Sequence, residues 1–475
     1  MNKYLIQAII QQATLDYVPV ANTIYIDQTN DSDGRNGSFS KPYNSFSEFT
    51  IEDNYIYKIK GTYTTSTPIS LVEKTAVTIG SYGLSLAKFD YTGADVFAVK
   101  INQSTNCTIN LEIDCNGTTQ YGIFLGSGSG GTTYVSGTGH TISGKIHNCY
   151  DGNSDYTACI IGGGIDITID DCEAYDSGSD GFYLRNTQNL VIDNSHIHHV
   201  NQNYGNANNL GTGASGDGIQ LDGTWKNYYI GNTIIDRSDE NTGNKFCLIL
   251  NSANEINATN NGIVEHCTFI AKTGVDMGCS VYVAQGDGNI FRYNTFVGGP
   301  LALRVSNYSD PVDTYTDTCL NTLIHNNIFH DCVNGVGVAY GGGAEDNRNT
   351  KVYNNTFYHV TGYHVWIDRS YVDLQNNIHC RAGDTGVALY NYGGGTYIIS
   401  NNCYDVSATA GTPGVGDDYV VGTPNFVDAA NHNFRLLSTS PCRNSGANVP
   451  ITEDFDGVSI PQESFPSIGA FEYTI

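Results

Sequence analysis

The chain of 475 residues has little of several residue types, and these shortages argue against whole classes of protein. Charged residues make up 15%, and only 2 Met, 2 Trp and 11 Pro occur. Beyond residue 21 no stretch spaces its apolar residues as an amphipathic helix does, so a helical fold is not expected. Lys and Arg number 22 against 48 Asp and Glu, which gives a formal net charge of −26. Repulsion at this charge argues against nucleic acid and anionic membranes as partners, and it disfavours a strongly anionic polysaccharide unless cations intervene.

The first 21 residues form a poor secretory signal. They contain one Lys and a short apolar run that Gln11 and Gln12 interrupt, which is too short to span a membrane. We therefore expect synthesis in a cytoplasm, no membrane insertion, and an N-terminal segment that docks onto a partner or a larger particle. A degraded signal is the alternative. The predicted organisation is an attachment segment over residues 1–21, a solenoid over 22–435 and a C-terminal cap over 436–475.

The cysteines show neither a C-x-x-C pair nor a spacing typical of metal sites. There are thirteen, an odd number, and several recur at fixed places in the repeats described below, among them Cys172, Cys267 and Cys403. Regular placement favours buried, reduced thiols that fill the core. It also indicates folding in a reducing compartment.

The most prominent positive feature is a recurring phrase of Asn, a small or branched residue, and then Phe, Ile, His or Tyr. Its intervals run from 22 residues (Asn355 to Asn377) to 38 residues (Asn194 to Asn232). Such irregular self-similarity predicts a solenoid with insertions of variable length. The intervening runs are β-rich, so the expected fold is an all-β, single-stranded parallel β-helix. Copies of the phrase begin at Asn194, Asn232, Asn294, Asn327, Asn355, Asn377 and Asn402, with degenerate copies at Asp171 and Cys267.

Asn at the same place in successive coils predicts a side-chain amide ladder at a corner. Each Asn of the phrase is also expected to adopt the left-handed backbone conformation that a tight corner needs. On this interpretation the Asn residues hold corners and take no part in chemistry.

A second strand repeats with alternating apolar residues, which predicts one buried and one outward face. Leu303, Val305, Val365, Ile367 and Leu389 are expected inside. An outward row of rings, amides and guanidinium groups suits a sugar polymer, because rings stack on sugar faces and polar groups bond hydroxyls. The alternative is that Tyr simply favours strands. The predicted outward row comprises Phe124, Tyr183, Gln220, Tyr282, Arg304, Trp366 and Tyr390.

Two Asp-Gly turns form the candidate catalytic centre. Asp180 and Asp217 align on the same strand, and Arg185 and Asp222 follow five residues later. Two carboxylates one coil apart raise the pKa of one of them, which is a common route to a general acid beside a general base, and a glycosidase needs such a pair. Alternatively these residues cap turns, or Asp176, Asp180 and Asp217 hold Ca²⁺.

A histidine cluster follows in the same region, before a long insertion over residues 201–215. His196 and His198 are spaced so that both lie on one strand face, which suits a metal ion. A third ligand is not evident from the sequence, and a polar turn that includes His199 is the plainer interpretation.

Both ends of the chain resemble known sequences. Ile24–Asp27 with the Gly-Ser-x-x-x-Pro-Tyr turn at residues 37–43 is similar to the entry of many right-handed parallel β-helix proteins. The close, Asn433–Leu436 through Ser440–Gly446 to Ile468–Tyr473, is similar to bacterial and phage proteins of the pectate-lyase-like superfamily. The resemblance implies this fold, but the same frame serves lyases, hydrolases, epimerases, tailspikes and adhesins.

The resemblance stops short of any one enzyme family. The pair Asp170-Asp171 resembles that of polygalacturonases, but their Gly-His-Gly is missing, and no complete set of lyase residues occurs. We therefore expect a β-helix on a virion surface or outside the cell that binds a polysaccharide, as tailspikes do, in which case a homotrimer is implied. Cleavage of the polymer is left open. The alternatives are a free polysaccharide lyase or glycoside hydrolase, and a structural or adhesive β-helix without catalysis.

Overall fold

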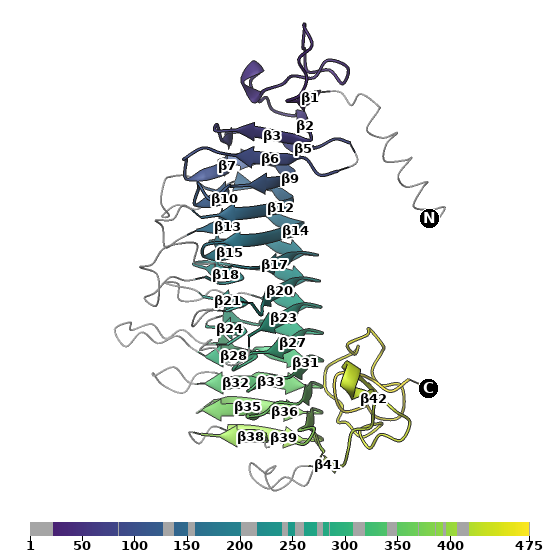
Figure 1. Ribbon diagram of the computed structural model, residues 1–475. Coiled ribbons are helices and arrows are strands. Elements are labelled where there is room, and N and C mark those ends of the chain that lie inside the picture. Colours follow the sequence, from purple (N-terminus) through teal and green to yellow (C-terminus); the bar gives the residue numbers. More distant parts are fainter. Residues whose placement is uncertain are drawn as a thin grey trace, which may run out of the picture. The chain divides into compact units, whose positions relative to one another are not determined.

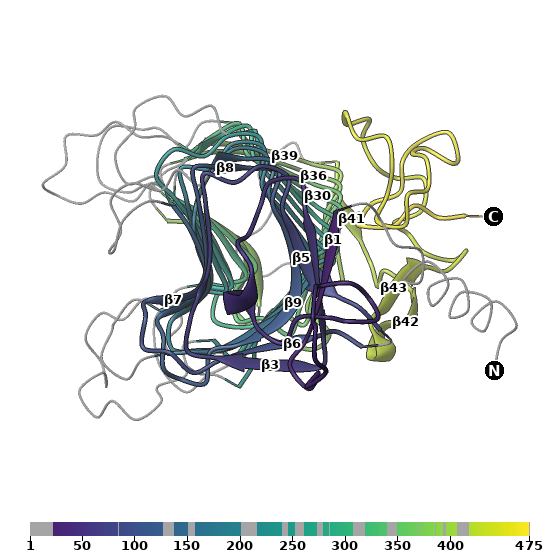
Figure 2. The same ribbon diagram turned by 90° about the horizontal axis from the view of Figure 1, so that it is seen from above.

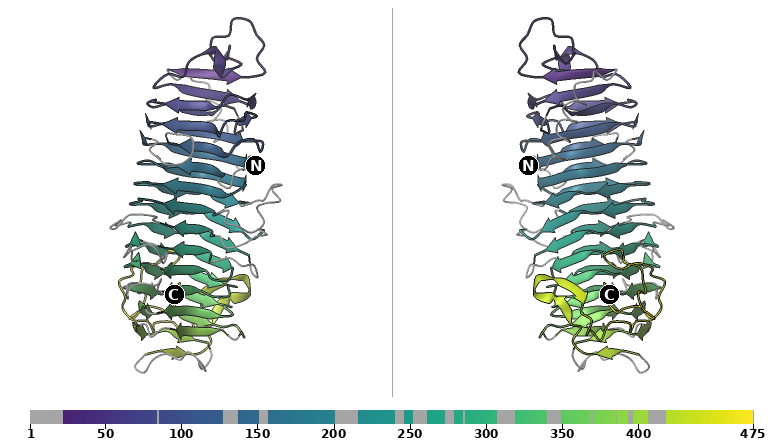
Figure 3. Two further views of the ribbon diagram at one scale, coloured as in Figure 1. Left: turned by 90° about the vertical axis from the view of Figure 1, so that its left-hand side faces the viewer. Right: turned by 90° about the vertical axis from the view of Figure 1, so that its right-hand side faces the viewer.

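The computed structural model describes residues 22–474 except for 84, 127–136, 151–156, 201–215, 240–245, 252–260, 273–278, 285, 307–318, 340–348, 369, 385, 393–395 and 406–417. The predicted attachment segment and the insertion after the histidine cluster therefore lie outside the described residues. The chain divides into two units, Met1–Ser215 and Gly216–Ile475. Both are made of short parallel strands that wind into stacked coils, as Figures 1 and 3 show within each unit. The all-β solenoid expected from the repeats is thus confirmed.

In the first unit one sheet runs through β1, β2, β5, β9, β12 and β14, and a second runs through β4, β7, β10, β13 and β15. β6 pairs with both β3 and β9, while β14 also pairs with β16 and β17. The elements are β1 (Thr23–Asp27), the 3₁₀ helix η1 (Phe46–Glu48), β2 (Ile56–Lys60), β3 (Thr62–Thr65), β4 (Ile69–Val72), β5 (Thr78–Ser81), β6 (Lys88–Tyr91), β7 (Phe97–Asn102), β8 (Ser104–Thr105), β9 (Thr108–Asp114), β10 (Tyr121–Leu125), β11 (Gly137–Thr138), β12 (Thr141–Cys149), β13 (Ala158–Gly162), β14 (Thr168–Ser177), β15 (Asp180–Arg185), β16 (Val191–Asp193) and β17 (His196–His198).

The second unit contributes three rows of parallel strands, which begin at β18, β19 and β20 and each add one strand per coil. They are followed by an antiparallel pair, β42 with β43. The elements are β18 (Ile219–Asp222), β19 (Tyr229–Gly231), β20 (Ile234–Arg237), β21 (Leu248–Leu250), β22 (Ile263–Glu265), β23 (Thr268–Ala271), β24 (Val281–Val283), β25 (Gly286–Asp287), β26 (Ile290–Arg292), β27 (Thr295–Gly298), β28 (Leu303–Ser306), β29 (Cys319–Leu320), β30 (Leu323–His325), β31 (Ile328–His330), β32 (Val336–Ala339), β33 (Thr350–Tyr353), β34 (Thr356–Tyr358), β35 (Tyr363–Asp368), β36 (Tyr371–Gln375), β37 (Ile378–Cys380), β38 (Val387–Asn391), β39 (Thr396–Ser400), β40 (Cys403–Tyr404), β41 (Val420–Val421), β42 (Phe426–Asp428), η2 (Ala429–Asn431) and β43 (Asn433–Leu436).

The predicted asparagine ladder is present inside the second unit. The side-chain amide of each Asn donates to the Oδ1 of the Asn one coil later, at 3.0 Å in every step. That Oδ1 also accepts a backbone N–H from the earlier Asn. All members are fully buried, so their polar atoms depend on these bonds. The ladder consists of Asn294, Asn327, Asn355, Asn377 and Asn402.

Two details of the ladder prediction were wrong. The left-handed backbone belongs to the residue before each ladder Asn, for example Asn326 and Asn354, with φ of 50° and 53°. In three copies the aligned residue itself occupies that corner: Asp171, Asn194 and Asn232 have φ of 51°, 47° and 46°. The inner position is then filled by the next residue. The Ser195 hydroxyl accepts the N–H of Cys172, and the Thr233 hydroxyl donates to the Gly231 carbonyl.

Corner and ladder select Asn for different physical reasons. At the corner a short polar side chain tolerates positive φ, whereas at the ladder the amide supplies a donor and an acceptor at once. The corner amides are also used: those of Asn326, Asn354 and Asn376 donate to carbonyls of Ala470, Ser467 and Ala447 in the C-terminal segment.

The core beside the ladder is a column of stacked rings. Phe269, Phe296, Phe329 and Phe357 follow one another with centroids 5.0, 4.6 and 4.8 Å apart, and His379 and Tyr404 continue the column. Across the interior, Val305 pairs with Val338 and Val338 with Ile367. Ile367 is fully buried, as the alternation of its strand predicted.

The C-terminal segment lies beside the coils of the second unit, where Figure 1 shows it in yellow and Figure 2 shows it outside their cross-section. Its Phe434, Ala470 and Phe471 pack on Ile328, and Leu436, Cys442 and Ile468 pack on outward residues of β37 and β40. The segment begins with β42, so the boundary expected between residues 435 and 436 falls inside β43.

All thirteen cysteines are buried and free, as predicted. Burial raises the pKa of the Cys380 thiol to about 12 and raises the pKa of Cys107 as well. A buried thiol that stays protonated is a poor nucleophile.

We therefore expect a thiol-reactive probe to label few of the thirteen cysteines in the native protein. In denaturant it should label most of them without prior reduction, because there are no disulfides to open. Mass spectrometry of the labelled protein counts the modified sites. Several disulfides found under non-reducing conditions would overturn both the core placement and the inferred reducing compartment.

Candidate functional site

The predicted outward row is in register through the second unit. Tyr282 pairs with Arg304, and after Gly337 the row continues with Trp366 and Tyr390. Gln220 precedes them and is separated from Tyr282 by Ile249. One residue per coil thus lies on the outer face of the sheet that runs from β18 to β38. The sequence had not placed Ile249 and Gly337 on this row, since neither is aromatic nor polar.

Tyr390, at the β38 end of this row, is more exposed than Tyr282. Tyr282 is only 6% exposed because it packs among Ile249, Cys279 and Leu301, whereas Arg304 and Trp366 are half-buried and Tyr390 is 38% exposed. Tyr363 stacks on Tyr390 with ring centroids 4.5 Å apart, and Tyr392, which is 68% exposed, adjoins the same ring. The outer end of the row is therefore an open aromatic surface. We call Trp366, Tyr363, Tyr390 and Tyr392 the aromatic platform.

The Arg304 guanidinium carries the positive charge of the row. Its carbon lies 5.2 Å from the centroid of the Tyr282 ring, and one nitrogen lies 3.5 Å from the Ser306 hydroxyl. Burial raises the pKa of Tyr282 to about 12, although the nearby Arg304 opposes the shift. The phenol therefore stays neutral, and the Arg304 guanidinium offers N–H donors suited to hydroxyl or carboxylate acceptors.

The first unit has its own outward row, of different character. Lys100, Phe124, Ile161 and Tyr183 are neighbours in register. The expectation that Phe124 is exposed was wrong: it is 2% exposed and packs with Tyr121, Ala158 and Ile161. Tyr183 is half-buried against this same cluster. The row in this unit is mainly an apolar cluster on the outside of the sheet.

The predicted catalytic residues are divided between the units. Asp180, Arg185 and the possible Ca²⁺ ligand Asp176 belong to the first unit, and Asp217 and Asp222 to the second. The pairing of Asp180 with Asp217, and that of Arg185 with Asp222, therefore stay predictions. The same holds for a Ca²⁺ ion shared among Asp176, Asp180 and Asp217.

Within each unit, three of these acids are buried and one lies at a corner of the backbone. Asp180 and Asp217 are each 3% exposed. Asp217 accepts the Phe246 N–H at 2.8 Å and lies 3.9 Å from the fully buried Arg237. Asp222 is 5% exposed and accepts the N–H of Gly223. Asp176 occupies a left-handed corner with φ of 51°, and Arg185 is half-buried at the end of β15.

Beside the histidine pair lies a third potential metal ligand, which was not evident from the sequence. Glu173 on β14 pairs in register with His196 on β17, and its carboxylate lies 3.3 Å from His198 Nε2. Potential ligand atoms of the three residues lie within 4.8 Å of one another. Lys145 also forms an ion pair with Glu173 at 2.5 Å. Burial raises the pKa of Glu173, but hydrogen bonds to Lys145 and His198 lower it more. A cation would have to compete with this lysine.

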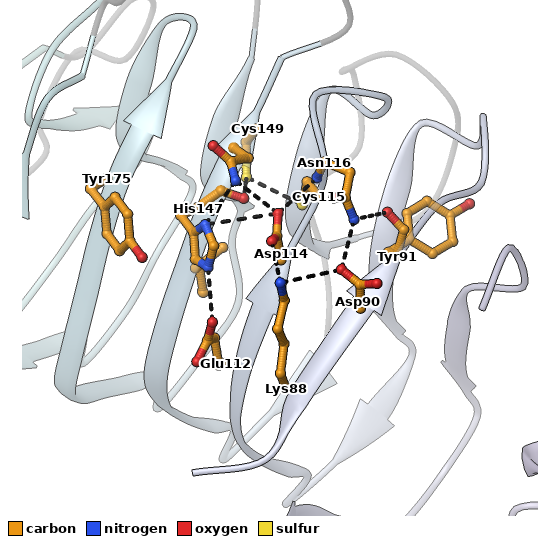
Figure 4. A network of polar contacts seen from close by, with 12 residues as sticks. Lys88, Asp90, Tyr91, Glu112, Asp114, Cys115, Asn116, His147, Cys149 and Tyr175 are labelled. Atoms are coloured by element: carbon orange, nitrogen blue, oxygen red, sulfur yellow. Dashed lines mark hydrogen bonds and ion pairs between the residues drawn. The ribbon is translucent and has the colours of Figure 1, made fainter. Parts of the chain in front are cut away.

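A network of charged groups that sequence reasoning missed lies on the outer face of β6, β9 and β12 (Figure 4). Lys88 lies 2.6 Å from Asp114 and 3.3 Å from Asp90, while His147 Nε2 lies 3.3 Å from Glu112. The Asp114 hydrogen bond raises the pKa of Lys88, and Lys88 in turn lowers the pKa of Asp114 against the effect of burial. The only signal in the sequence is that charged and apolar residues alternate within the strands, as at Glu112 and Asp114.

This network favours cohesion of the coils. The His147 ring stacks on Tyr175 at 4.6 Å, and Tyr175 stacks on His198 at 5.1 Å, so three successive strands are joined by rings as well as by charges. Lys88 is paired with Asp90 and Asp114, and Glu112 contacts His147, so these side chains are engaged within the protein.

One pocket of about 350 Å³ lies near the N-terminal end of the first unit. Its lining includes Phe46, Phe49, Tyr63, Ile69 and Phe89, with no carboxylate or histidine among its described lining residues. These aromatic side chains suit an apolar ligand better than a reaction that needs an acid and a base.

Comparisons with known proteins bear on the fold. The family model described as "Right handed beta helix region" matches residues 255–425. The fold is a right-handed parallel β-helix. No curated protein matches the chain in sequence. Among the described residues, no helix has the length and apolar character needed to cross a bilayer.

Solved structures share this β-helix at low sequence identity. XylC in complex with xylose has a TM-score of 0.54 and 9% identity, over 95% of this chain and 98% of that one. Pectate lyase Pel9A has a TM-score of 0.46 and 14% identity, over 98% and 100% of the two chains. The tailspike protein of E. coli bacteriophage HK620, in complex with a hexasaccharide, has a TM-score of 0.47 and 12% identity, over 88% and 73%. At such identities the likeness concerns the fold alone.

Proposed function

We propose that this β-helix binds a polysaccharide along the outer face of the second unit, from Tyr282 to Tyr390. The observation that carries the proposal is the row of Tyr282, Arg304, Trp366 and Tyr390, in register along the stack and widened by Tyr363 and Tyr392 into the aromatic platform. Parallel strands repeat at about 4.8 Å, so an extended polymer lying along the stack meets a new residue of the row at each coil.

The chemistry of the row suits sugar. Aromatic faces cover the apolar faces of pyranose rings, and Tyr and Trp keep a polar group free for a hydroxyl. Arg304 donates to hydroxyl or carboxylate oxygens. Gly337, which stands between Arg304 and Trp366, adds no side chain, and an added Cβ there would lie 3.5 Å from the Trp366 indole. Because Gly337 has no side chain, this position of the row does not cover the neighbouring side of the indole.

The setting that we propose is the outside of a cell or the surface of a virion, with the N-terminal segment attaching the chain to a larger particle and a homotrimer as the assembly. The buried free thiols support synthesis in a reducing compartment before such an assembly. Size-exclusion chromatography with light scattering tests the trimer. A monomer that depolymerises its substrate would favour a free lyase or hydrolase, and binding without cleavage would favour an adhesin.

Tryptophan fluorescence gives a direct test of the proposed surface. The chain has two Trp, of which Trp225 is fully buried and Trp366 is half-buried on the row. Acrylamide quenching should therefore report Trp366, and a bound polymer should protect it. We expect a screen of capsular and algal polysaccharides to include one that does so. Reducing ends and the ultraviolet absorbance of unsaturated uronate, read in the same incubations, show whether that polymer is cut.

Substitution of the platform should weaken binding of the polymer selected in that screen. We expect Trp366→Ala and Tyr390→Ala each to raise Kd about 5- to 100-fold, because lost stacking area at a contact centre costs about 1–3 kcal/mol. Isothermal titration calorimetry measures the change.

Tyr397→Ala is the matched control for this prediction. Tyr397 is 37% exposed, against 38% for Tyr390, but lies on β39 in another sheet. Its removal should leave Kd within about twofold. Equal losses in the platform and control variants would remove the aromatic platform from the binding site.

A further inference from the structure

A second cluster of potential metal ligands joins the C-terminal segment to the coils of the second unit. His330 is the last residue of β31, Asp331 follows at a left-handed corner with φ of 57°, and His432 follows η2 in the C-terminal segment. Asp331 Oδ2 lies 2.7 Å from His330 Nδ1 and 3.5 Å from His432 Nε2. The two imidazole rings are 4.1 Å apart between centroids.

We propose that His330, Asp331 and His432 bind a divalent cation of the zinc class. Each offers one ligand atom, and these atoms lie within 4.8 Å of one another, so they can converge on one ion with small side-chain movements. Two imidazole nitrogens and one carboxylate oxygen are a usual protein ligand set for Zn²⁺, with water completing the coordination. Ca²⁺ fits poorly, because it requires six to eight oxygen ligands.

The surroundings of the cluster hold the ligands in place. His330 is buried, and its ring lies beside that of Phe434. His359 Nδ1 contacts the other oxygen of Asp331 at 2.5 Å, and its Nε2 lies 3.0 Å from Asp384. An outer carboxylate–histidine pair of this kind orients a ligating group and increases its affinity for a metal. His359 is therefore a positioning residue, and Oδ2 of Asp331 is the oxygen that faces the ion.

The cluster also differs from the histidine pair of the first unit in the partners that would compete with a cation for the carboxylate, which is Asp331 here and Glu173 there. Among the described residues, the ion pairs of Asp331 are all with histidines: His330, His359 and His432. Glu173, by contrast, is engaged by Lys145.

An ion at this place would fasten the C-terminal segment to the coils. His432 stands 102 residues after His330 along the chain and reaches it only because the segment folds back onto β31 and β34. A ligand that binds the folded state alone stabilises it according to its concentration and affinity. Zn²⁺ should thus raise the melting temperature and protect the segment from proteolysis.

The test uses the full-length protein after treatment with EDTA, with ZnCl₂ as the titrant. In calorimetry we expect saturable Zn²⁺ binding, with one site fewer in His432→Ala. Zn²⁺ should also raise the melting temperature of the parent protein but not that of this variant. His432 is half exposed on a surface segment, so the variant should fold. His359→Ala should weaken the same site by about 10-fold or more while the stoichiometry is kept. Co²⁺ in place of Zn²⁺ should give visible absorption bands that disappear in His432→Ala.

Two matched variants separate this site from others. His266→Ala removes an exposed histidine of the same unit that contacts Tyr293 and no described carboxylate cluster, and it should bind Zn²⁺ as the parent does. His196→Ala breaks the cluster in the first unit. Absence of saturable Zn²⁺ binding, or a site that is lost in His196→Ala but kept in His432→Ala, would overturn the proposal.

Discussion

Replacing Asn355 by Leu is expected to lower the free energy of unfolding by about 4 kcal/mol or more, or to prevent folding of the second unit altogether. The Asn355 amide donates to Ile324 O, Tyr353 O and Asn377 Oδ1 at 2.9, 3.0 and 3.0 Å. Its oxygen accepts the N–H and the side-chain amide of Asn327 at 2.9 and 3.0 Å. Leu would leave several of these buried groups unpaired, at about 1–3 kcal/mol each.

Urea denaturation followed by circular dichroism measures this loss. Asn355→Thr is a milder variant that places at this position the residue found at 233, and it should fold with a smaller loss. The matched control is Asn334→Leu, since Asn334 also bridges coils, to Pro300 O and Tyr363 N, but is only half-buried. Water can replace its bonds, so a loss within about 1 kcal/mol is expected. Similar losses in Asn355→Leu and Asn334→Leu would show that burial of the ladder does not decide its contribution.

Acidification from pH 7 to pH 4 is expected to destabilise the second unit by at least about 4 kcal/mol. Burial lowers the pKa of His325 to about 4 and that of His364 to about 3, and it also lowers the pKa of His379, all from 6.5. Below pH 6.5 these histidines are protonated in the unfolded chain but stay neutral in the folded chain. The free energy of unfolding therefore decreases as the pH falls from 6.5 to the pKa values of the folded state. A shift of one unit corresponds to about 1.4 kcal/mol.

Nearby charges modify these titrations without reversing them. Arg292 lowers the pKa of His325 further and Glu265 opposes this, while Arg381 lowers that of His364. His379→Phe removes one titrating group and suits the column of rings, since His379 stacks on Phe357 at 5.3 Å. Denaturation curves at several pH values should show a shallower acid limb for this variant. The exposed His266→Ala should leave the limb unchanged, and an unchanged limb in both variants would assign the acid sensitivity to other groups.

Much of the fold could be predicted from the sequence because strand alternation and corner chemistry are local. The alternation placed Ile367 inside and put Tyr282, Arg304, Trp366 and Tyr390 on one outward row. The regular cysteines indicated buried thiols. The alignment of Asn194 and Asn232 failed by one residue because two adjacent positions both favour Asn, one for its backbone conformation and one for its amide.

Only the tertiary structure decided what each side chain meets across the coils. Phe124 and Tyr282 point outward as their strands require, yet neighbours on the outer face bury both. Asp217 is a buried partner of Arg237, which the Asp-Gly turn does not reveal. His330 and His432 come together only because the C-terminal segment packs on β31. The sequence therefore determines the repeat period and the face of the strand on which a side chain lies, because both depend on neighbouring residues. The packing of side chains across coils depends on the lengths of the insertions and on where distant segments fold back onto the coils.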